Sequence, residues 1–235
     1  GSSSRSMGDN VSDLALSLAD CKQLLGLRDA EWCSATPTLE ADIAAAAMGL
    51  DDLGHSRVLA GCLSELGTDP RGPERETDPA AYRNVAFLDD TWTEWEQFVA
   101  ANAILDTAFS VLIESLVEGE VELLRTRLRK MLAEERYHFL HGRSWLNELG
   151  SSPAVVQAWT EAVEWFGPDG GELRKRLAAK LERPEPKKLE IDWSKWDPVR
   201  RRTEKGAIDK PTFDMLRGLE ERRYGITNAE TPARG

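Results

Sequence analysis

The sequence is poor in histidine and cysteine, with three of each among its 235 residues. The cysteines are Cys21, Cys33 and Cys62. Their number is odd and their spacing matches no zinc motif, which argues against a disulfide framework and against a structural zinc site. We therefore expect reduced, packed thiols in a cytoplasmic protein.

Several other features are missing, and each excludes a class of function. No apolar run approaches the length of a membrane span, and we expect residues 1–6 to be a polar start rather than a signal peptide. The sequence has no glycine-rich phosphate loop, no nucleophile elbow and no paired-cysteine motif. The net charge of -11 argues against binding to nucleic acid or to an anionic membrane surface through the general field of the protein.

The residues that are abundant predict an all-α fold. Leu, Ala and Glu are frequent and β-branched runs are rare. The apolar spacing predicts helices over residues 11–33, 37–66, 88–118, 120–149, 153–166 and 172–181, with a long connection over 67–82. We expect a disordered start over residues 1–10, a helical bundle over 11–182, and a C-terminal tail with a short helix over 183–235. The tail carries Trp193 and Trp196, which should pack either on the bundle or on a partner.

Two pairs of residues indicate the chemistry of the bundle. Asp52 and His55 stand three positions apart, as do Glu135 and His138, and residues at this spacing share one side of a helix. A carboxylate and a histidine from each of two helices form the core of a carboxylate-bridged metal site in a ferritin-like four-helix bundle. The third histidine, His141, lies one turn beyond His138 and is expected at the surface or beside the ligands.

The same architecture requires one further carboxylate from each helical pair, about thirty residues before the paired motif. Asp106 lies 29 positions before Glu135, inside an apolar run, where a carboxylate is unusual. Counting back 30 from Asp52 reaches Lys22, and counting back 29 reaches Gln23. The predicted metal set is therefore Asp52, His55, Asp106, Glu135 and His138, with Lys22 in place of the sixth ligand. The neighbouring Asp51 is either solvated or lies beside the ligands.

Charge counting leaves the presence of metal open. Three carboxylates and one lysine sum to -2, which one divalent ion balances. Two protonated histidines balance the same charge without any metal, because buried charges must be paired. A lysine ammonium among carboxylates keeps its proton and is a poor ligand. Lys22 is thus either a substitute for the cation or a charge partner beside bound iron.

Several stretches resemble the phenylacetic acid catabolic family, the ferritin-like subunits of the multicomponent phenylacetyl-CoA 1,2-epoxidase. They comprise residues 24–28, 37–44, 49–57 and 134–141, together with Ala30-Glu31-Trp32-Cys33. The resemblance covers residues 11–166. It implies either the catalytic type of subunit (PaaA), whose two-iron site activates oxygen, or the supporting type (PaaC), which has lost most ligands. The local sequence at residues 30–33 and 136–141 is closer to the PaaC type.

Two hypotheses follow. In the first, the chain is a PaaC-like subunit with a degenerate di-iron site that pairs through helix faces with a related catalytic subunit, or with a second copy. In the second, it is a metal-dependent oxygenase or oxidase that uses one or two iron ions. The resemblance alone implies a coenzyme A thioester as substrate.

Overall fold

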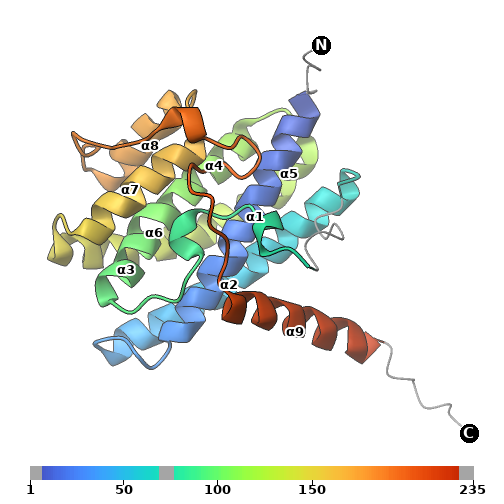
Figure 1. Cartoon of the computed structure of the whole chain (residues 1–235), viewed down its shortest axis with the longest axis horizontal. Helices are drawn as coiled ribbons and strands as arrows, with labels where there is room; N and C mark the ends of the chain where they lie inside the picture. The colour runs from blue at the N-terminus through green and yellow to red at the C-terminus, as the bar shows by residue number, and fades with distance from the viewer. Residues whose placement is uncertain (1–6, 69–76, 228–235) are drawn as a thin grey trace, which may run out of the picture.

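The computed structural model describes residues 7–68 and 77–227, leaving aside the side chains of residues 7–10 and 220–227. Within that part the chain is helical or irregular, and its one β interaction is an isolated bridge between Asp197 and Arg202. The arrangement is a ferritin-like helical bundle with additional C-terminal helices (Figure 1). The predicted fold class is confirmed.

The first helical pair consists of α1 (Met7–Trp32) and α2 (Leu39–Glu65). Thr38 caps α2, because its side chain accepts a hydrogen bond from the backbone N–H of Ala41. The two helices cross closely at Gly26 and Gly49. A Cβ added at Gly26 would lie 2.8 Å from the carbonyl oxygen of Gly49, so glycine at the crossing sets the separation of the two helices.

The second helical pair joins a long apolar segment to α6 (Arg129–Leu149). The apolar segment consists of α3 (Trp95–Ala100), the π-helical turn η4 (Ala101–Leu105) and α4 (Asp106–Glu118). A short helix, α5 (Glu122–Arg127), leads into α6. A Cβ added at Gly142 of α6 would lie 2.8 Å from Ala103 Cα, so α6 packs directly on the backbone of the π-helical turn.

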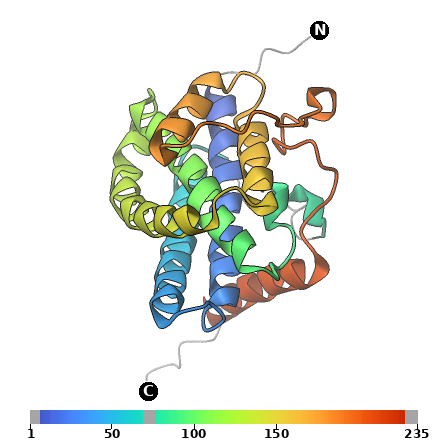
Figure 2. The same cartoon turned by 90° about the vertical axis from the view of Figure 1, so that its left-hand side faces the viewer.

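Two further helices cover the second pair. They are α7 (Pro153–Phe166), which packs on η4, and α8 (Gly171–Leu181), which packs on α4 (Figures 1 and 2). Trp165 of α7 is buried and donates its indole N–H to Ser17 of α1 over 2.8 Å. The core therefore continues from the first pair to α7 without interruption.

The C-terminal segment lies against the bundle, which is one of the two alternatives expected from its tryptophans. Trp196 donates its indole N–H to the carbonyl oxygen of Glu164 over 2.8 Å. Arg202 is buried and forms an ion pair with Asp89. The last helix, α9 (Lys210–Thr227), begins beside α1, where the buried Arg28 donates to Thr212 Oγ1 over 2.8 Å.

Three helix boundaries differ from the prediction. α1 begins at Met7, inside the segment expected to be disordered, of which residues 1–6 lie outside the described part. The third long helix begins at Trp95 rather than near residue 88, because Glu94 and Gln97 form a capping box. The predicted helix over residues 120–149 is divided at the buried Leu128, which separates α5 from α6.

Among the described residues, one helical stretch, Trp95–Glu118, is long and apolar enough to cross a membrane. However, 89% of its most apolar window is buried inside the protein, as expected for the central helix of a bundle.

We expect the substitution Gly142→Ala to destabilise the protein by about 1–3 kcal/mol, because the new methyl group meets backbone atoms of η4 that cannot move aside. Gly171→Ala is the matched control, since a Cβ at that position meets nothing within 4 Å. Urea unfolding of both variants measures the difference. An unchanged midpoint for Gly142→Ala would contradict the close packing of α6 on η4.

Candidate functional site

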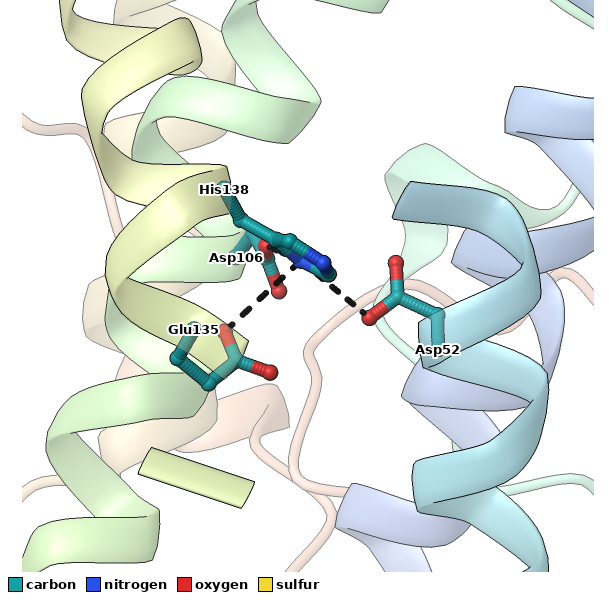
Figure 3. A group of neighbouring side chains, drawn as sticks. All are labelled: Asp52, Asp106, Glu135 and His138. Carbon is teal, nitrogen blue, oxygen red and sulfur yellow. Dashed lines mark hydrogen bonds and ion pairs between the residues drawn. The ribbon is translucent and has the colours of Figure 1, made fainter. Parts of the chain in front are cut away.

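The residues predicted as a site come together in the centre of the bundle. The buried members are contributed by α1 (Lys22), α2 (Asp52 and His55), the first residue of α4 (Asp106) and α6 (Glu135 and His138). Figure 3 shows four of these side chains converging from α2, α4 and α6. All six positions found by helical spacing therefore meet in one cluster, while their roles stay predictions.

Lys22 lies at the centre of this cluster. Its ammonium group donates to Asp52 Oδ1 over 2.9 Å, and it also contacts Asp106 Oδ1 and Glu135 Oε1. The side chain of Lys22 is fully buried. Burial alone would lower the pKa of this lysine, but the three carboxylates outweigh burial and hold its pKa well above the usual value.

The two histidines link the helices crosswise. His138 on α6 lies with Nδ1 3.0 Å from Asp106 Oδ2 and with Nε2 3.2 Å from Asp51 Oδ2 on α2. His55 on α2 lies with Nε2 2.7 Å from Glu134 Oε2 on α6. Each imidazole therefore spans from the buried cluster to a carboxylate near the surface, which fixes the orientation of the ring.

The ionisation of the histidines follows from these contacts. Burial would lower the pKa of His138, but Asp52, Asp106 and Glu135 outweigh burial and raise its pKa to about 10. The pKa of His55 is raised as well, against the effect of burial, mainly by its contact with Glu135. His138 is then cationic at neutral pH, and the surroundings of His55 favour its cationic form.

The pKa values of two carboxylates of the cluster, Asp52 and Glu135, shift in opposite directions. Burial raises the pKa of Asp52 to about 7, although Lys22 opposes the shift. Burial would also raise the pKa of Glu135, but Lys22 and the two histidines lower it below its usual value. Ser110 supports Glu135 by donating to its Oε2 over 2.7 Å. With both histidines protonated and all three carboxylates ionised, three positive and three negative charges would make the cluster neutral.

Four members of the cluster could hold a metal ion. Asp52, Asp106, Glu135 and His138 each offer one ligand atom, and these atoms lie within 4.8 Å of one another. Lys22, however, already contacts all three carboxylates of this set. A divalent ion on the same oxygens would lie beside the ammonium and be repelled by it. With the ammonium in this position Lys22 engages these oxygens, so a metal ion fits the set only if the lysine side chain moves away.

Several neighbours of the cluster were not predicted from the sequence as partners. Ser110 stands four positions after Asp106, and Asp29 stands seven after Lys22, so helical spacing places each on the same face as a predicted residue. Asp29 is buried and accepts from Asn102 Nδ2 over 2.7 Å. Burial and the neighbouring Asp52 raise the pKa of Asp29 well above its usual value.

His141 lies outside the cluster, as the sequence suggested. It is half-buried, and its ring lies 4.5 Å from that of Tyr137 and 5.5 Å from that of Trp145, measured between centroids. Asp51, for which two placements were open, contacts His138. The cysteines are free, and Cys33 is exposed rather than packed.

Comparison with known proteins shows the family to which the chain is related. A family model described as phenylacetic acid catabolic protein matches residues 4–225. The chain belongs to this family. The match includes most of the C-terminal tail, which the resemblance seen in the sequence did not reach. Membership confirms the family named from the sequence motifs.

A curated relative of this chain is the C subunit of the 1,2-phenylacetyl-CoA epoxidase of Escherichia coli (strain K12). The two sequences are 27% identical over 191 residues, which cover 76% of this chain and 75% of the relative. This similarity agrees with the PaaC type that the motifs favoured.

Replacing Lys22 by methionine should destabilise the protein by about 3–5 kcal/mol at pH 8, because three buried carboxylates lose their shared cation. The loss should shrink near pH 5, where the carboxylates of the variant take up protons. Urea unfolding at both pH values tests this, with Lys130→Met as a control because the side chain of Lys130 is 88% exposed. A pH-independent loss would show that Lys22 acts through packing alone.

The raised pKa of His138 predicts a second pH effect. A histidine that gains carboxylate partners in the folded state stabilises the fold fully below its unfolded pKa. That stabilisation is lost as the pH rises from about 6.5 towards 10. The free energy of unfolding should therefore fall in this range, by at most about 1.4 kcal/mol per pH unit. In urea unfolding across this range, His138→Gln should flatten the profile, whereas His141→Gln should not.

Proposed function

We propose that this chain is a supporting ferritin-like subunit of a phenylacetyl-CoA 1,2-epoxidase-type assembly, a ring-epoxidising monooxygenase. The observation that carries the proposal is the contact of the Lys22 ammonium with all three carboxylates of the candidate metal set. Membership of the phenylacetic acid catabolic family and similarity to a PaaC-type relative support it. In this view Lys22 replaces one carboxylate of a former di-iron site and also supplies the missing positive charge.

The supporting role follows from what a closed ionic cluster can do. Lys22 joins α1 to α2, α4 and α6 through one group, so the cluster ties the bundle together in the way a metal ion would. It offers no open coordination position at which oxygen could bind. The chain would then hold a catalytic ferritin-like subunit in its productive form through contacts between helix faces, inside the cytoplasm. The coenzyme A thioester would bind to the assembly.

A second candidate function is a metal-dependent oxygenase or oxidase that uses Asp52, His55, Asp106, Glu135 and His138 with one or two iron ions. The mutual distances within the set of four residues favour it. It requires the Lys22 side chain to leave the cluster when metal enters, and to act beside the metal as an acid or charge partner.

Metal analysis of protein expressed with iron supplied separates the two candidates. The supporting subunit should retain well below one iron per chain. Lys22→Glu should gain tightly bound iron, because it restores the absent carboxylate while the other ligands keep their positions. The double variant Lys22→Glu with His138→Ala is the matched control and should lose the gained metal. Stoichiometric iron in the unmodified chain would overturn the proposal.

A reconstitution experiment tests the role within the assembly. The chain is co-expressed with a ferritin-like subunit from the same source that has a complete set of metal ligands. We expect the two chains to co-purify, and the epoxidation of phenylacetyl-CoA to need both of them. Full activity of the second subunit alone would contradict the supporting role.

A further inference from the structure

The outer face of α2 is apolar but lies at the surface. Leu39, Ile43 and Leu50 are 71%, 60% and 70% exposed, and Val58 is 41% exposed. Figure 2 shows α2, in light blue to cyan, at the edge of the bundle. Singly exposed leucines are ordinary, but a row of them along one long helix marks a contact surface.

The exposed residues of α2 follow the spacing of a helix–helix contact. Apolar or small residues recur at intervals of three and four positions, which is the pattern of a seam between two long helices. We call this set, with the arginine that shares its face, the α2 seam. It consists of Leu39, Ile43, Ala46, Leu50, Gly54, Arg57 and Gly61.

We propose that the α2 seam binds the α2 seam of a second copy of this chain, antiparallel, about a two-fold axis at Leu50. This interface does not depend on the function proposed above. A two-fold interface requires a surface that is complementary to itself, so each residue before the axis must suit the residue equally far behind it. The α2 seam meets that condition.

In the register about Leu50, two of the four pairs of facing positions contain a glycine. Leu39 of one copy faces Gly61 of the other, and Ala46 faces Gly54. A Cβ added at Gly54 or at Gly61 would have no atom within 4 Å, so both glycines leave open space over the seam. Glycine and alanine at these positions permit a second helix backbone to come close.

A groove beside the seam provides the receiving site for Ile43 of the second copy. One wall consists of Leu50, Gly54 and Val58 of α2 with Met131 of α6, and ionisable side chains of α2, α5 and α6 line the rest. In the antiparallel register Ile43 faces Arg57, which is adjacent to Gly54 and Val58 on the helix surface. The side chain of Ile43 would therefore reach the apolar wall of a groove that this chain leaves open.

Charge supports the antiparallel direction. Arg57 lies exposed in the second half of α2, and Glu40 lies exposed in its first turn. An antiparallel partner brings the first turn of its α2 near Arg57: Glu40 faces position 60, about 4.5 Å along the helix from Arg57, where the opposite charges attract. A parallel two-fold partner would instead place arginine against arginine at this level of the seam, which is unfavourable.

Sedimentation equilibrium of the full chain tests the proposal. We expect a dimer at micromolar concentration, and Leu50→Glu should weaken it by at least about 100-fold, because each copy then buries a charge on the axis. Leu50 is 70% exposed, so the folded monomer should tolerate the change. Val156→Glu on α7 is the matched control, since Val156 is also exposed but lies outside the seam.

Cysteine cross-linking tests the register. In a Cys33→Ser background, which removes the exposed native thiol, Leu50→Cys should give a disulfide-linked dimer under mild oxidation. Leu39→Cys should not, because two copies of position 39 are about 33 Å apart in the antiparallel register. A parallel dimer would cross-link at both positions.

Three results would overturn the proposed interface. In the first, the chain stays monomeric alone and binds only a different subunit through α2. In the second, Leu50→Glu leaves the dimer intact. In the third, Leu39→Cys forms the cross-link. Circular dichroism of each variant establishes that it is folded, so that a monomer is not mistaken for an unfolded chain.

Discussion

The structure depends on one buried ammonium group and the three carboxylates around it. Lys22 connects α1 to three other helices, and removing any member of the cluster would leave a charge unpaired in the core. Such a cluster is costly to bury and is stable only as a complete set. This requirement explains why the surrounding helices are held so closely, since a small displacement of one helix would separate charges that must touch.

The backbone features near the cluster serve that requirement. The glycines at the crossing of α1 and α2, Gly26 and Gly49, allow the close approach that brings Lys22 within reach of Asp52. The π-helical turn ends immediately before Asp106, and a π-helical turn shifts the faces on which the residues after it lie. The cluster and the irregular backbone around it are therefore parts of one arrangement.

The sequence predicted the positions of the cluster well because helical spacing is regular. Positions such as Asp106 and Lys22 follow from the length of the helices and the rise per residue, and small errors at the helix ends do not alter them. The division at Leu128 and the π-helical turn could not be predicted in this way, since both depend on tertiary packing. The crosswise contacts of Asp51 and Glu134 depend on how α2 and α6 face each other, which periodicity within one helix does not determine.

The charge of residue 22 is what distinguishes the two candidate functions on this scaffold. With a carboxylate there, the buried set carries an excess of negative charge that cations must balance, so metal binding and folding are linked. With lysine there, in the supporting role proposed above, the same set is neutral once the histidines are protonated and the carboxylates ionised, so the fold would not need metal. A single side chain can thus convert a metal centre into an internal salt bridge while the helices, the histidines and their outer carboxylates keep their places. The presence of the ligand motif is for this reason strong evidence for the fold and weak evidence for catalysis.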